Sequence, residues 1–174
     1  MNKFEFGKEY YLTTYNEIDE YIKNIITDDE NKQIKYIFTN GSLCWRETNN
    51  SKNYSLDTEI YIVFDNDSVL RIDYKFYGLV YARYMWIQNL NIREKEFNND
   101  EFKLDLDVTN TRIEGYEIEN FSEEYEINPS TGTTRPKGGD YFKKIIFKLS
   151  NGKKLCICAE DSVVDGYCEV LVEE

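Results

Sequence analysis

The residues with the clearest chemical potential are carboxylates concentrated between Asp100 and Glu126. That stretch holds ten acids against two basic residues, Lys103 and Arg112, so it carries −8 of the chain's total charge of −12. Asp105-Leu106-Asp107 resembles the acid pairs that bind Mg²⁺ or Mn²⁺ in metal-dependent enzymes. Because other acids surround the pair and no lysine-bearing nuclease motif lies near, the pattern favours a solvated acidic surface over a metal centre.

The acidic stretch also alternates with apolar residues. Phe102, Leu104, Leu106 and Val108 alternate with Lys103, Asp105 and Asp107; Tyr116 and Ile118 alternate with Glu117 and Glu119; Tyr125 and Ile127 alternate with Glu124 and Glu126. A period of two predicts strands with one apolar and one acidic face. Acids two residues apart on a strand are about 7 Å apart, roughly the axial rise of two phosphates along DNA. The predicted partner-binding surface comprises Asp105, Asp107, Glu114, Glu117, Glu119, Glu124, Glu126 and Tyr116.

Several familiar chemistries are excluded or disfavoured by composition. The chain has no histidine, so it has no Ser-His-Asp triad, no Cys-His pair and no histidine-ligated zinc. The loop Gly132–Gly139 lacks the Walker spacing and the following helix of a phosphate-binding loop. The aromatic run at 74–86 lacks the basic surroundings of single-strand binders. We therefore expect no catalytic residue, no metal and no cofactor.

The four cysteines are predicted to be free thiols. Their spacing, with Cys156 and Cys158 two apart, Cys168 ten further on and Cys44 distant, is unusual for zinc. The N-terminus lacks a signal-like apolar run and no stretch approaches about 18 apolar residues, so the predicted location is cytoplasmic. A pI near 4.6 disfavours direct binding to nucleic acid or anionic membrane. The residue usage is typical of a low-GC bacterial or phage genome.

The elements that must position these residues are mostly strands. Thr14 and Glu17 form a capping box before an amphipathic pattern, which predicts a helix at 15–27. Strands are predicted at 33–39, 59–64, 69–76, 80–86, 141–149, 154–159 and 166–172, besides the acidic ones. Residues 42–57 and 88–100 are expected to be irregular. Gly78 is predicted to mark a bulge or corner.

The 174 residues predict a single domain, 1–174, in which the loop 128–139 separates two half-units, 1–127 and 140–174. Two hairpins, Tyr61–Asp73 and Lys144–Ile157, look alike, which leaves a duplication as an alternative to chance. The predicted fold class is α+β and β-dominant. It would have antiparallel, aromatic-rich sheets in a sandwich or partly open barrel and one N-terminal amphipathic helix.

The profile is small, acidic, aromatic-rich and free of catalytic motifs. In composition, though in no motif, it is similar to the immunity proteins that neutralise bacterial toxins and to phage-encoded anti-CRISPR inhibitors. This resemblance implies a non-enzymatic inhibitory binding protein that docks an acidic β face, as a nucleic-acid mimic, on a basic toxin or nuclease. Two alternatives stay open: a carboxylate-based, metal-dependent enzyme, and a structural component that buries a sheet edge in an oligomer.

Overall fold

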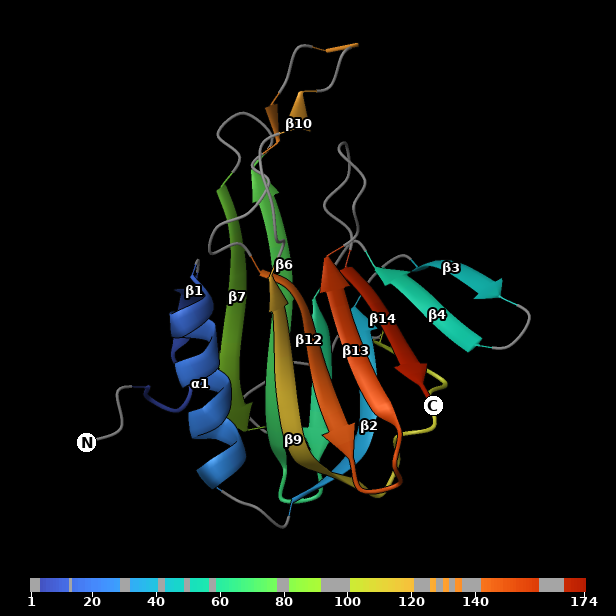
Figure 1. The fold of residues 1–174 in the computed structure, drawn as a ribbon. Coiled ribbons are helices and arrows are strands. Elements are labelled where there is room, and N and C mark those ends of the chain that lie inside the picture. The colour runs from blue at the N-terminus through green and yellow to red at the C-terminus, as the bar shows by residue number, and fades with distance from the viewer. Residues whose placement is uncertain are drawn as a thin grey trace.

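The computed structural model describes residues 4–12, 14–28, 32–40, 43–48, 51–56, 59–77, 82–91, 101–120, 126–127, 130–131, 134–135, 142–159 and 168–174. Within these residues, one helix, α1 (Tyr15–Asp28), lies among fourteen strands (Figure 1). The strands are β1 (Glu9–Leu12), β2 (Gln33–Asn40), β3 (Leu43–Thr48), β4 (Ser51–Leu56), β5 (Ile60–Phe64), β6 (Ser68–Tyr77), β7 (Ala82–Asn91), β8 (Glu101–Lys103), β9 (Thr111–Asn120), β10 (Glu126–Ile127), β11 (Thr134–Arg135), β12 (Phe142–Leu149), β13 (Lys154–Ala159) and β14 (Cys168–Glu173).

The helix confirms its sequence signals. The Thr14 backbone N–H donates to Glu17 Oε2 at 3.2 Å, and the Glu17 N–H donates to Thr14 Oγ1 at 3.3 Å, which is the reciprocal capping box. Ile18 and Ile22 are fully buried on the apolar stripe. At the other end, Lys32 Nζ donates to the Ile25 carbonyl at 2.9 Å, so an ammonium group offsets the negative end of the helix dipole.

Twelve strands form one open antiparallel sheet in the order β1-β7-β6-β5-β2-β9-β12-β13-β14-β4-β3, with β8 also on β2. We call β1, β7, β6, β5, β2 and β8 the back half-sheet, and β9, β12, β13, β14, β4 and β3 the front half-sheet (Figure 1). Residues of both half-sheets and of α1 share one apolar core, which includes Ile22, Ile62, Leu70, Ile145 and Ile157. The predicted β-dominant α+β fold is therefore confirmed.

One segment, residues 101–120, joins the two half-sheets. Its first part follows β2: β8 pairs with Phe38–Asn40, and the N–H of Leu104 donates to Ile37 O at 2.9 Å. β9 then starts on β2, with Thr111 opposite Ile34, and continues along β12, with Ile118 opposite Ile145. A strand that changes partners in this way turns the corner between two packed layers. The acidic stretch is thus the seam of the fold.

Several strand predictions are wrong. Residues 43–48 and 51–56 form the paired strands β3 and β4 where an irregular stretch was predicted, and β4 extends the front half-sheet beside β14. β7 runs to Asn91, which overturns the connection predicted at 88–91, and the short strand β1 was not predicted. Cross-strand backbone bonds stabilise these segments despite their polar or short sequences. Gly78 and most of the 128–139 loop lie outside the described residues, and the division into half-units stays a prediction.

Candidate functional site

Asp105 and Asp107 do not lie on a strand, contrary to the prediction. Only Glu101–Lys103 is strand, and the following backbone bonds are local: the Leu106 N–H donates to Leu104 O at 3.0 Å, and the Val108 N–H to Leu106 O at 2.9 Å. Such three-residue turns keep alternate side chains on opposite sides. Leu104, Leu106 and Val108 are buried while both aspartates are exposed. The predicted alternation of buried and exposed side chains is therefore confirmed, although the predicted strand ends at Lys103.

Asp107 is engaged by the β12–β13 turn. Its carboxylate lies 2.6 Å from Lys153 Nζ, and its backbone carbonyl accepts from Asn151 Nδ2 at 3.3 Å. The Asp107 side chain remains 75% exposed, so the ion pair is screened by solvent. Within the described residues, no three Cys, Asp or Glu side chains cluster in a way that could hold a metal ion. A metal site at Asp105 and Asp107 has no geometric support.

The acids of β9 lie on the outer face of the front half-sheet, away from the core. Glu114, Glu117 and Glu119 are exposed, and the residues of β12 on the same face are Lys144, Ile146 and Lys148, with Ile146 directly opposite Glu117. Glu117 forms an ion pair with Lys148, whose hydrogen bond and charge lower the pKa of the carboxyl. Glu119 is opposite Lys144 in the strand register. This part of the predicted surface is therefore a charged face on a rigid strand, with acids and lysines side by side.

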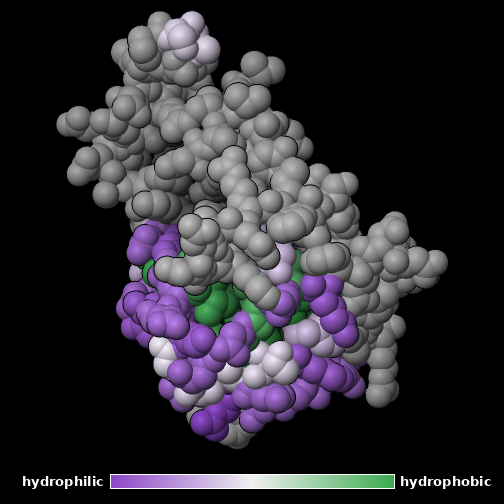
Figure 2. Space-filling view, turned by 90° about the vertical axis from the view of Figure 1, so that its right-hand side faces the viewer, coloured by the Kyte–Doolittle hydropathy of each residue, from purple (hydrophilic) through white to green (hydrophobic). Residues whose placement is uncertain are grey.

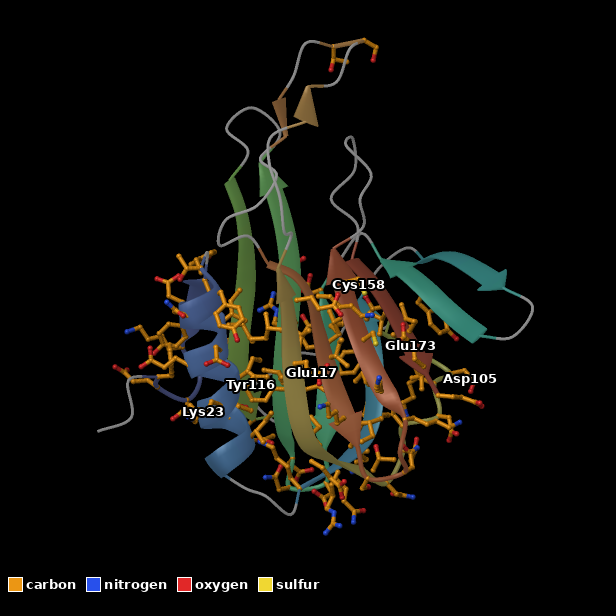
Figure 3. The ribbon with its side chains drawn as sticks, in the orientation of Figure 1. Lys23, Asp105, Tyr116, Glu117, Cys158 and Glu173 are labelled. Carbon is orange, nitrogen blue, oxygen red and sulfur yellow. The ribbon has the colours of Figure 1, made fainter. Side chains whose placement is uncertain are left out.

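Tyr116 lies on the other face of β9. Its hydroxyl donates to Asp19 Oδ1 of α1 at 2.7 Å, and its ring packs against the core. Burial raises the pKa of the Tyr116 phenol, and the Asp19 carboxylate raises it further. Figure 3 shows Tyr116 towards α1, Glu117 in the middle of the molecule and Asp105 far to the right. Tyr116 thus fixes the helix to the sheet and does not share a face with Glu117.

The last predicted site residues are only partly described. Glu124 lies outside the described residues. Glu126 lies in β10, opposite Arg135 of β11, in a two-stranded sheet separate from the main one. The structure therefore brings together Glu114, Glu117 and Glu119, places Asp105 and Asp107 on a separate segment, and gives no common surface for the seven predicted residues that it describes.

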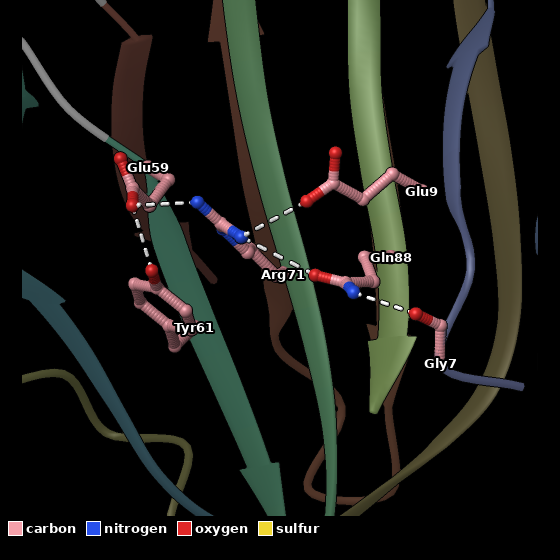
Figure 4. Close-up of polar contacts among 6 residues, drawn as sticks. All are labelled: Gly7, Glu9, Glu59, Tyr61, Arg71 and Gln88. Carbon is pink, nitrogen blue, oxygen red and sulfur yellow. Dashed lines mark hydrogen bonds and ion pairs between the residues drawn. The ribbon is translucent and has the colours of Figure 1, made fainter. Parts of the chain in front are cut away.

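A second polar cluster, not expected from the sequence, lies on the outer face of the back half-sheet (Figure 4). Arg71 on β6 makes an ion pair with Glu59 at 3.0 Å and donates to Gln88 Oε1 on β7 at 3.2 Å. Tyr61 donates to the same Glu59 oxygen at 2.7 Å. Burial raises the pKa of Glu59, but the bonds from Tyr61 and Arg71 outweigh it, so the pKa lies below the ordinary value.

This Arg71 cluster has a structural role. Gln88 Nε2 donates onward to the Gly7 carbonyl at 2.8 Å, so the cluster links β5, β6 and β7 to the N-terminal segment. Its carboxylate and guanidinium are committed to one another, which leaves them poorly placed for acid–base chemistry. The only sequence signal was period-two spacing, which puts Glu59 with Tyr61 on one strand face.

On the right-hand side of the molecule, Figure 2 shows hydrophilic side chains around a small hydrophobic area in the described surface. No helix among the described residues is long and apolar enough to span a membrane. Comparison with known proteins gives no match to a family model, to a curated protein or to a solved structure.

Proposed function

We propose that this chain is a non-enzymatic inhibitory binding protein that docks the outer face of β9 on a basic, nucleic-acid-handling protein. The observation that carries the proposal is the placement of Glu114, Glu117 and Glu119: all three are exposed on one strand whose other face is packed on the core. A strand whose inner face is packed on the core holds its outward charges in fixed positions, which favours recognition of a rigid basic surface.

The lysines of β12 shape how such docking works. Glu117 already has Lys148 as a partner, so a cation of the bound protein exchanges with Lys148 instead of meeting an uncompensated charge. Exposed pairs are weak, and their exchange therefore costs little. The net charge of −12 acts over longer distances and increases the association rate. We therefore expect the charges to affect binding mainly through the association rate constant.

A structural role in an oligomer is the second candidate, because the sheet is open. Among the described strands, β1 has only β7 as a neighbour and β3 has only β4, so each ends the sheet with unpaired backbone groups. The metal-dependent alternative is disfavoured, because Asp107 is paired with Lys153.

The test starts with capture of the partner from the host lysate and its identification by mass spectrometry. Association is then measured by stopped flow for wild type and for Glu117→Gln/Glu119→Gln. The matched control is Glu5→Gln/Glu20→Gln, which removes the same charge at two exposed positions outside β9, one in the N-terminal segment and one on α1. We expect a several-fold slower on-rate for the β9 variant alone, and a wild-type on-rate that falls steeply with salt. Equal on-rates for the two double variants would contradict the proposal.

A further inference from the structure

The outer face of the front half-sheet contains a thiol that is unexpectedly inaccessible. Ile146, Cys156 and Leu171 are cross-strand neighbours on β12, β13 and β14. They point away from the core, because the adjacent Ile145, Ile157 and Val170 belong to it. Yet Cys156 is 0% exposed. A side chain on the outer face of a sheet can be buried only if something lies over it.

An ion pair crosses this row on the outer face. Lys144 is opposite Cys158 on one side of the row, and Glu173 is opposite Lys154 on the other. Lys144 Nζ nevertheless reaches Glu173 Oε1 at 3.3 Å, so the two side chains span the row diagonally. Burial raises the pKa of the Cys156 thiol to about 11, with Lys144 lowering it and Glu173 raising it, so both charged groups lie next to the sulfur.

We propose that the Lys144–Glu173 ion pair is a lid over the Cys156 thiol, and that a basic group competing for Glu173 opens it. Glu173 is 44% exposed and Lys144 only 16%, so the carboxylate is the accessible half of the lid. Opening leaves the Lys144 ammonium beside a newly accessible thiol, which favours the reactive thiolate. Since Glu117 and Glu119 lie on the same face, a docked basic partner reaches Glu173; this last step alone rests on the proposed function.

The lid is tested on the isolated full chain, without a partner. Native protein is pulsed with N-ethylmaleimide at pH 8, and the labelled cysteines are located by peptide mapping with fragmentation. The thiolate adds to the maleimide double bond, the C–S bond forms, a proton goes to the neighbouring carbon and no group leaves. Labelling of the half-buried Cys158, which lies opposite Lys144 on the same face, is recorded in the same maps.

The variant is Glu173→Gln, which keeps the shape and removes the charge, and the control is Glu174→Gln, one residue further along. We expect labelling of Cys156 to rise about two- to fivefold in Glu173→Gln, the range expected from loss of a partly exposed ion pair. Glu174→Gln should label as wild type does. Raising NaCl should increase Cys156 labelling in wild type but not in Glu173→Gln, because salt screens the ion pair.

Equal Cys156 labelling in wild type and Glu173→Gln, or an equal rise in Glu174→Gln, would overturn the lid. A Cys156 rate in wild type that does not change with salt would do the same, with no variant involved. Because none of these measurements uses a partner, failure of the lid is separate from failure of the docking proposal. The latter is decided by the on-rates of the β9 variant.

Discussion

Lys32 is the residue whose removal tests the packing of α1 most directly. Its side chain is only 9% exposed, its Nζ donates to the Ile25 carbonyl at 2.9 Å, and it lies 4.7 Å from the centre of the Phe64 ring. Lys32→Met keeps the aliphatic stem and removes the ammonium. The change loses a charged hydrogen bond of about 1.5–3 kcal/mol and a cation–π contact of roughly 0.5–2 kcal/mol.

An opposing effect must be subtracted, because a buried ammonium is desolvated and methionine is not. The substitution also leaves the Ile25 carbonyl without its donor at a buried helix end, and this cost outweighs the relieved desolvation. We expect a net loss of about 2 kcal/mol, which for a chain of this size is roughly 4–8 °C in melting temperature.

The assay is thermal unfolding followed by circular dichroism, with urea unfolding as a second measure. Lys35→Met is the matched control: it makes the same substitution at an exposed position of β2, where the expected effect is within about 0.5 kcal/mol. A Lys32→Met protein that melts at the temperature of Lys35→Met would refute the reasoning, and would mean that desolvation cancels the hydrogen bond.

Three further outcomes follow from the described contacts. Ile22→Asp buries a carboxylate at a position that is 0% exposed, so it should lose several kcal/mol of unfolding free energy; an unchanged melting temperature would show that α1 does not pack on the sheet. The pKa of Glu59 is lowered in the folded state, so its contribution to stability is present above its ordinary pKa of 4.5 and is lost as pH falls below it. The melting temperature should therefore fall less steeply for Glu59→Gln than for wild type as the pH is lowered from 6 to 3. An equally steep fall in the two proteins would contradict this. Tyr116→Phe removes the bond to Asp19 and should cost about 1 kcal/mol, as should Asp19→Asn; a double-mutant cycle without coupling would argue against the bond.

Short sequence motifs predicted the elements whose stabilising contacts lie within a few residues of one another. The capping box of Thr14 and Glu17 and the apolar stripe of α1 placed the helix within one residue of its observed end. The Ser150-Asn151-Gly152 turn was predicted as well, and Gly152 adopts a positive φ of 83° there. Such features are visible in sequence because each partner lies within a few residues of the other.

The features that the sequence did not reveal depend on register between distant strands. The hairpin β3–β4 has a polar sequence, and its place in the sheet comes from the pairing of β4 with β14, more than a hundred residues later. Arg71 meets Gln88, and through it Gly7, only after β6 and β7 are aligned. Likewise, the acids of β9 were predicted to be exposed, but their lysine neighbours on β12 follow from the register of the two strands.

The pairing of β4 with β14 has a consequence for how the chain folds as it is made. Ser51–Leu56 leaves the ribosome long before Cys168–Glu173, so β4, which can pair early with β3, must wait for its second neighbour until β14 has been synthesised. Pairings between such distant segments are slow to form, and an unpaired strand edge is prone to aggregation in the meantime. During synthesis, the back half-sheet can assemble first, because α1, β2, β5, β6 and β7 all lie within residues 15–91, with β3 and β4 between β2 and β5 left to pair later. The edge of the front half-sheet then forms only after β14 has been made, and the yield of folded protein depends on how quickly β4 and β14 pair once both are available.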